Sequence, residues 1–222
     1  MKTIVRMAVL GVACTIVSAG CLSMGKKPVP MRRFVLEAEI ATDGREQASA
    51  KTLERSELPV LAIGRFRGTL EASERAIRWV DVAHARTGRL ADGEFAQPAV
   101  DSLKSSLWSG LYGLPGYRLI ADAGIVSAGR QNTDLLEGWI EHCRLVRYPE
   151  GYWQAEMRVQ FLLYRKGVLE REFRVWSEQS AMSDGVPTAE TAVGLFRGTL
   201  LDLLRQVQGQ LTVTNRHEAV RR

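Results

Sequence analysis

The segment from Tyr152 to Tyr164 alternates apolar and polar side chains more regularly than any other part of the chain. Its apolar positions are every second residue: Trp153, Ala155, Met157, Val159, Phe161 and Leu163. The positions between them are polar over most of the segment: Gln154, Glu156, Arg158 and Gln160. A period of two predicts a β-strand that packs one face on a core and keeps the other face in water. The segment therefore indicates a sheet covered on one side only.

Turn sequences place this strand in the middle of a three-strand meander. Pro149-Glu150-Gly151 and Arg165-Lys166-Gly167 are turn sequences, and they connect it to strands predicted at Leu135–Tyr148 and Val168–Ser177. Other strands are predicted at Arg32–Ile40, Leu58–Arg67, Ala76–His84 and Tyr117–Ala121. Turns are predicted at 86–89 and 91–93, and loops at 42–56 and 181–187.

Two segments have helical periodicity. In Pro98–Leu114 the apolar residues recur every three or four positions, at Val100, Leu103, Leu107 and Leu111, and Thr188–Leu211 has a similar apolar stripe with Thr188 placed as its N-cap. Strands followed by helices in this order predict an α+β fold, with a mainly antiparallel sheet and two principal helices packed on one face. We expect a single domain over residues 32–211 and a basic, frayed tail at 212–222.

The N-terminal segment has the features of a secretory signal peptide over residues 1–20. Lys2 and Arg6 precede the apolar run Met7–Val17, and Ser18-Ala19-Gly20 leads into Cys21. A bilayer core about 30 Å thick needs about 20 apolar residues in a helix, so this run is too short to span it. We therefore interpret the segment as an export signal and not as a membrane anchor.

The cysteine that follows the small residues resembles the bacterial lipobox, in which cleavage falls between Gly20 and Cys21 and the new N-terminal cysteine receives lipid. Ser18 stands where the lipobox usually has leucine. We expect a diacylglycerol and an N-acyl chain such as palmitate on Cys21, no other cofactor, and a lipidated tether over residues 21–31. Cys14 is a rival lipid site inside the apolar run. The alternative is an ordinary secreted protein in which Cys21 is incidental.

Charge and cysteine content narrow the function classes. The formal charge of the 222 residues is +5, and loss of Lys2 and Arg6 with the signal peptide leaves 5 − 2 = +3, which is no argument for nucleic-acid binding. Cys143 is the other cysteine of the processed chain, so no intramolecular disulfide is expected. Its apolar neighbours favour a buried, inert thiol over a reactive one.

Catalytic and metal-binding patterns are absent from the sequence. It has no phosphate-binding loop, no nucleophile elbow and no zinc-binding histidine pair, and His142 and Cys143, as strand neighbours, point to opposite faces. Glu170 and Glu172 could act as paired carboxylates, but with arginines beside them they are better interpreted as solvated hairpin charges. We therefore predict a protein that is not an enzyme and holds no metal. The five tryptophans are expected mostly in the core, with a lipid groove or a partner contact as the alternative.

Several segments in order carry a family resemblance: Arg33-Phe34-Val35-Leu36, Val60–Gly64, Phe95-Ala96-Gln97-Pro98, Asp134–Gly138 and the terminal helix Leu195–Val207. With the lipobox cysteine, this layout resembles the ABC-type transport auxiliary lipoproteins, the PqiC-like family. The resemblance implies a non-catalytic periplasmic lipoprotein that assists an MCE-type ABC transporter moving phospholipids between the inner and outer membranes. It also implies an MCE-domain protein as partner. Leu22 after the lipidated cysteine implies the periplasmic face of the outer membrane.

Two other functions remain open at this point. The first is a lipoprotein that assists envelope assembly, for lipopolysaccharide, outer-membrane proteins or secretion machinery, because such proteins share the α+β layout. The second is a secreted enzyme, for which the residues offer no constellation. The sequence also leaves open whether the chain forms a homo-oligomer.

Overall fold

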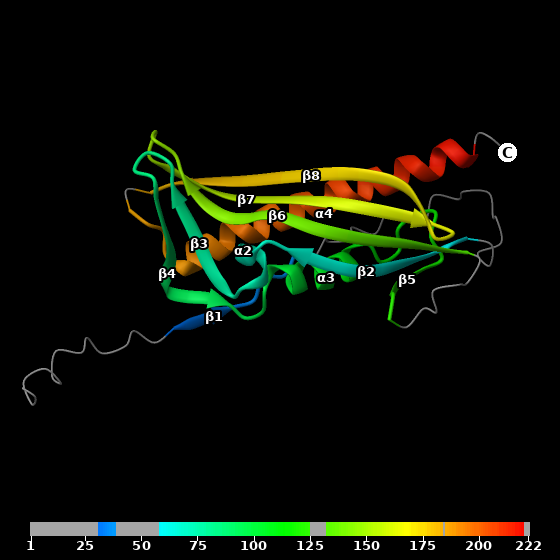
Figure 1. The fold of residues 1–222 in the computed structure, drawn as a ribbon, viewed down its shortest axis with the longest axis horizontal. Helices are drawn as coiled ribbons and strands as arrows, with labels where there is room; N and C mark the ends of the chain where they lie inside the picture. Colours follow the sequence, from blue (N-terminus) through cyan, green and yellow to red (C-terminus); the bar gives the residue numbers. More distant parts are fainter. Residues whose placement is uncertain (1–30, 39–57, 125–131, 184, 220–222) are drawn as a thin grey trace, which may run out of the picture. The chain divides into compact units, whose positions relative to one another are not determined.

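The fold is built around three long antiparallel strands, β6 (Thr133–Arg147), β7 (Tyr152–Arg165) and β8 (Val168–Met182). The computed structural model describes residues 31–38, 58–124, 132–183 and 185–219 (Figure 1), all within the unit Met31–Arg222. At the β7–β8 turn, Lys166 and Gly167 have φ angles of 52° and 78°. Two consecutive positive φ angles are the geometry of a tight hairpin turn. The predicted meander is therefore confirmed.

The other edge of β6 is shared by two shorter strands that both run parallel to it. β2 (Val60–Gly68) pairs with the first part of β6, and β3 (Ala76–Asp81) pairs with its last three residues. The short helix α2 (Leu70–Ser73) lies between them in the chain. Outside these lie β5 (Leu119–Asp122), parallel to β2, β4 (Arg86–Phe95), antiparallel to β3, and β1 (Arg32–Phe34), parallel to β4. The two longest pairings are antiparallel and the parallel ones are short.

Two helices cover one face of this sheet, as predicted for an α+β fold (Figure 1). They are α3 (Ala99–Gly110) and α4 (Ala189–Ala219). The six apolar side chains of β7 all lie in the core shared with these helices. Thr199 of α4 donates a hydrogen bond to the Ala155 carbonyl of β7 (3.3 Å). Thr188 caps α4 as expected, because its hydroxyl accepts the Thr191 N–H (3.3 Å).

The predicted turns at 86–89 and 91–93 are wrong, because both lie inside strand β4. Their glycines serve close packing instead of chain reversal. A Cβ on Gly88 would lie 2.5 Å from Cζ2 of Trp79, and a Cβ on Gly93 would lie 2.7 Å from Cε2 of Phe34. Glycine inside a strand often marks a place where another group approaches the backbone closely. The sequence shows the glycines but not the aromatic rings that lie over them.

The predicted wet face of β7 is also wrong at one end. Gln154 and Glu156 are only 5% and 8% exposed, although they point away from the helices. Glu156 accepts hydrogen bonds from Arg144 (3.3 Å) and from the hydroxyl of Tyr148 (2.9 Å). These partners come from the neighbouring strand and its turn, so the strand's own pattern does not reveal them.

Element ends differ from the sequence prediction in several places. β1 ends at Phe34, β3 ends at Asp81 in place of His84, and α3 ends at Gly110. α4 continues to Ala219 through part of the segment expected to fray. Helix α2 was not predicted, and β8 extends to Met182, into the expected loop. The loop predicted at 42–56 lies outside the described residues.

Candidate functional site

The outer edge of β2 is partly open. β2 pairs with β6 along most of its length, but its pairing with β5 stops at Ile63. β5 ends because the Asp122 carboxylate accepts the Gly124 N–H (2.8 Å) and turns the chain. Within the described ranges, residues 64–68 therefore have no strand partner on that side. Unpaired strand edges are templates for pairing with another chain.

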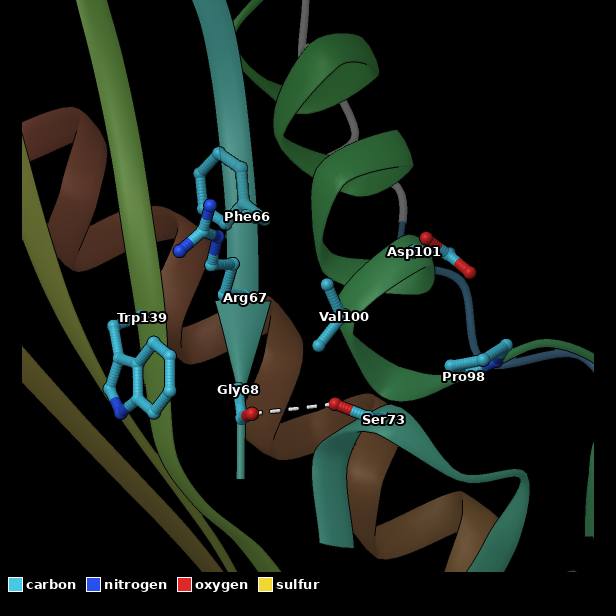
Figure 2. A pocket seen from close by; sticks show the side chains of 8 residues that line it. All are labelled: Phe66, Arg67, Gly68, Ser73, Pro98, Val100, Asp101 and Trp139. Atoms are coloured by element: carbon cyan, nitrogen blue, oxygen red, sulfur yellow. Dashed lines mark hydrogen bonds between the residues drawn. The ribbon is translucent and has the colours of Figure 1, made fainter. Parts of the chain in front are cut away.

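Two hollows that share lining residues follow this open edge, and we call them together the β2 groove. Phe66, Val100 and Asp101 line both hollows, whose volumes are about 380 and 510 Å³. The first is completed by Arg67, Gly68, Ser73, Pro98 and Trp139 (Figure 2). The second is completed by Gly64, Arg65, Lys104, Asp122, Ala123, Gly124, Leu135 and Glu137. The groove therefore lies between the sheet edge and the first turns of α3.

Gly68 lets α2 and α3 approach the end of β2. A Cβ at this position would lie 2.8 Å from Cβ of Ala72 and 3.1 Å from Cγ2 of Val100. Ser73 closes the groove at this end, because its hydroxyl donates to the Gly68 carbonyl (3.4 Å; Figure 2). Figure 2 shows Val100 pointing from α3 toward β2, while Asp101 points away from it. The apolar side chains of Phe66 and Val100 therefore lie next to charged side chains in the groove.

Charges of both signs line the groove. Arg65 and Arg67 are exposed, and neither forms an ion pair with any residue that the structure describes. Lys104 pairs with Asp122 (2.7 Å). The hydrogen bond from Lys104, followed by that from the Gly124 N–H, lowers the pKa of Asp122. A surface that combines apolar and charged side chains suits a polypeptide better than a simple anion.

Trp139 stands beside Arg67 on the neighbouring strand and is 43% exposed. The expectation that the tryptophans lie mostly in the core is wrong for three of them, since Trp108, Trp139 and Trp176 are all exposed. Trp153 is fully buried and Trp79 packs against the core. The alternation along β6 could have predicted that Trp139 is exposed, because Trp139 lies between the buried residues Gly138 and Ile140.

The other chemical groups singled out in the sequence do not meet at this groove. Cys143 is buried, and burial, followed by the charge of Glu71, raises the pKa of its thiol to about 12, as expected for an inert cysteine. Glu170 pairs with Arg165 (3.1 Å) and Glu172 accepts a hydrogen bond from Gln160 (2.7 Å). Among the described residues no group of three or more histidine, cysteine or acidic side chains could hold a metal.

One further cluster was missed in the sequence. The Asp81 carboxylate binds the Nδ1 atom of His84 (2.9 Å) and Nη1 of Arg147 (3.3 Å), and it also accepts the His84 N–H (3.1 Å). Because it joins the end of β3 to the turn and to β6, we interpret it as a structural anchor. In the sequence, only the spacing of three residues between Asp81 and His84 pointed to this cluster.

The predicted lipidation and cleavage residues, Cys21 and Gly20, lie outside the described residues. Within residues 31–38, 58–124, 132–183 and 185–219, no helix is both long enough and apolar enough to cross a membrane.

Comparison with known proteins shows the fold but no family. No family model matches the chain, and no curated protein matches it. Among solved structures, it is similar to protein XCC0632 of Xanthomonas campestris, from family DUF330, with 10% identity and a TM-score of 0.65. That likeness covers 85% of this chain and 99% of the other. An uncharacterized protein is similar with 12% identity and a TM-score of 0.52, over 69% of this chain and 92% of its own.

Proposed function

We propose that this protein is a lipid-anchored, non-catalytic docking component of the bacterial envelope, and that the β2 groove is where it accepts a partner. The observation that carries the proposal is the open edge of β2 beside a groove lined by both apolar and charged side chains. The partner would contribute an extended segment that pairs with residues 64–67, because the Gly68 carbonyl already accepts a hydrogen bond from Ser73. Strand addition of this kind draws affinity from main-chain hydrogen bonds and specificity from side-chain pockets.

The side chains around the groove suit such a segment. Val100 and Phe66 offer apolar contact inside it, and Arg65 and Arg67 offer charge at its rim. Trp139 adds an exposed aromatic side chain, and tryptophan and arginine are the residue types that most often dominate binding energy at protein interfaces. An acidic side chain in the partner would therefore find an arginine without displacing an existing ion pair.

The resemblance to the ABC-type transport auxiliary lipoproteins suggests which partner this is. We propose an MCE-domain periplasmic protein of an ABC transporter that moves phospholipids between the two membranes. The lipid on Cys21 would hold the chain on the periplasmic face of the outer membrane. The fold shared with the DUF330 protein supports the architecture only.

Site-specific photo-cross-linking in intact cells tests this proposal. A photoreactive residue at Arg67 should capture an MCE-domain protein, and the same residue at Arg205, which is exposed on α4, should not. Cys21→Ala, which removes the lipid, should weaken the capture. Recovery of envelope-assembly components in place of a transporter protein would favour the alternative assembly role. Equal products from both positions, or none from either, would contradict docking at the groove.

A further inference from the structure

The opposite edge of the sheet is formed by β8, which is longer than the open part of β2. It runs from Val168 to Met182 and pairs with β7 only, among the strands that the structure describes (Figure 1). Fifteen residues at about 3.4 Å each give an edge roughly 50 Å long. Natural sheets usually protect such an edge with lysine, proline or a covering element. β8 contains neither lysine nor proline; its five charged side chains are of both signs, so they can pair with those of another strand, and α4 packs against it.

Among the residues that the structure describes, no strand pairs with the outer edge of β8, and one carbonyl on that edge is bonded by a side chain of α4. The Trp176 carbonyl accepts a hydrogen bond from the Gln206 side chain of α4 (3.1 Å), so it points away from β7. Because backbone groups alternate in direction along a strand, Arg174 and Glu178 direct theirs to the same side as Trp176. Among the described residues, the side-chain amide of Gln206 thus binds one of these three carbonyls, and it would have to rotate away before a strand could pair there.

The side chains of β8 are complementary to a second β8. In a two-fold antiparallel pairing, residues equally far from the axis face each other. An axis at Trp176 places Arg174 opposite Glu178 of the second copy, and the same pair recurs on the other side of the axis. It also brings together two tryptophan rings that are each 51% exposed in the single chain.

Most neighbouring registers are unfavourable. An axis at Arg174 would oppose two arginines, an axis at Glu172 would oppose two glutamates, and an axis at Val175 would oppose Glu172 and Glu178. Like charges directly opposite each other destabilise a strand pair. An axis at Phe173 also avoids like charges, but it pairs a shorter stretch and sets Trp176 against Glu170. The axis at Trp176 gives the longest overlap with matched charges and joined aromatic rings.

We propose that β8 is a self-association edge, at which two copies of this chain pair antiparallel about a two-fold axis at Trp176 and continue one sheet across both. The β2 groove lies at the other side of the sheet, so a partner at the groove and a second copy at β8 use separate surfaces. The inference stands independently of the proposed transporter role.

Charge reversal tests the register. Two differently tagged copies of the full chain are co-expressed, solubilised in mild detergent and purified through one tag. Arg174→Glu and Glu178→Arg should each lower recovery of the second tag at least tenfold, and the double reversal should restore it to within twofold of wild type. Arg205→Glu, on the exposed face of α4, is the matched control and should change nothing. Arg174 is 63% exposed, but its reversal also removes ion pairs to Glu141 (3.3 Å) and Glu172 (3.9 Å), so circular dichroism must verify that the fold persists.

Other outcomes overturn the proposal. Wild-type copies that do not co-purify, or an Arg174→Glu variant that co-purifies like wild type, would remove the self-association edge. Failure of the double reversal to restore recovery in a folded protein would do the same. Rescue of Arg174→Glu by Glu172→Arg, and not by Glu178→Arg, would overturn the axis at Trp176.

A covalent test reads the axis directly. With Trp176→Cys, the two substituted residues of a pair face each other, at a Cα separation suited to a disulfide. Oxidation of intact cells should then yield a covalent dimer on a non-reducing gel. Trp139→Cys, at a position on β6 that is also exposed (43%, against 51% for Trp176) but lies away from the edge, should yield none. Absence of the dimer from Trp176→Cys, or equal dimer from both variants, would contradict the pairing.

Discussion

Replacing Gly138 by alanine should destabilise the fold through one ring. A Cβ at this position would lie 2.3 Å from Cε1, 2.7 Å from Cδ1 and 3.1 Å from Cζ of Phe66. Contacts this short require the ring to move. The Phe66 ring meets Phe161 edge to face (centroids 6.0 Å apart), and Phe161 in turn stacks on Phe173 (5.2 Å). Retreat of the Phe66 ring therefore displaces a packed aromatic row.

The magnitude follows from the cost of overpacking a core, about 1–3 kcal/mol. Alanine would otherwise gain about 0.5–1 kcal/mol over glycine inside a strand, so the sign depends on whether the ring can yield. For a domain of this size each kcal/mol shifts Tm by roughly 2–4 °C. Subtracting that gain leaves a net cost of up to about 2.5 kcal/mol, so we expect Gly138→Ala to lower Tm by up to about 10 °C.

Thermal unfolding of the full chain in detergent, followed by circular dichroism, measures this shift. Gly209→Ala is the matched control, because a Cβ at Gly209 meets nothing within 4 Å and the position is exposed on α4. It should raise stability by about 0.5–1 kcal/mol through helix propensity. In a Phe66→Leu background, Gly138→Ala should cost less than in the wild type. A Tm for Gly138→Ala at or above that of wild type would refute the reasoning.

Three further predictions concern buried or paired groups. Tyr117→Phe removes the hydroxyl that donates to buried Asp134 (3.1 Å) and should cost about 1–3 kcal/mol in urea unfolding; an unchanged urea midpoint would contradict this role. Burial opposes ionisation of Asp81, but its bonds to His84 and Arg147 outweigh it and lower its pKa. The stabilisation is therefore present above the unfolded pKa of about 3.9 and lost as pH falls through the folded value, so Asp81→Asn should flatten the acid limb of stability measured by urea midpoints. The Cys143 thiol, buried and with a pKa of about 12, should react with a maleimide at pH 8 only after unfolding, and rapid labelling of the folded protein would contradict its burial.

Periodicity within a segment was enough to predict the meander and both principal helices. The alternation of Tyr152–Tyr164 identifies the buried face of β7, because side chains on a strand point to opposite sides regardless of what covers them. The same local logic places Thr188 at the start of α4 and Cys143 in the core. These inferences need only the chain's own period and the preference of apolar groups for burial.

Part of the candidate site was also within reach of the sequence. Arg65 and Arg67 alternate with buried residues of β2, and Trp139 is out of phase with the buried positions of β6. The groove itself was not predictable. It exists because β5 stops at Asp122, more than fifty positions along the chain from β2, and because Val100 on α3 approaches Gly68. Contacts between segments so far apart leave no periodic mark in either one.

The sequence by itself determined the meander, both principal helices and the apolar side of each, although not strand β4 or helix α2, because those properties depend on residues two to four positions apart. Tertiary structure alone decided that Gly88 and Gly93 lie under aromatic rings in a strand, and that Glu156 is buried beneath Tyr148 and Arg144. It also decided which strand edges stay open, at β2 and β8. Edges and close approaches depend on which strands become neighbours, and that pairing is settled by packing of the whole sheet against α3 and α4.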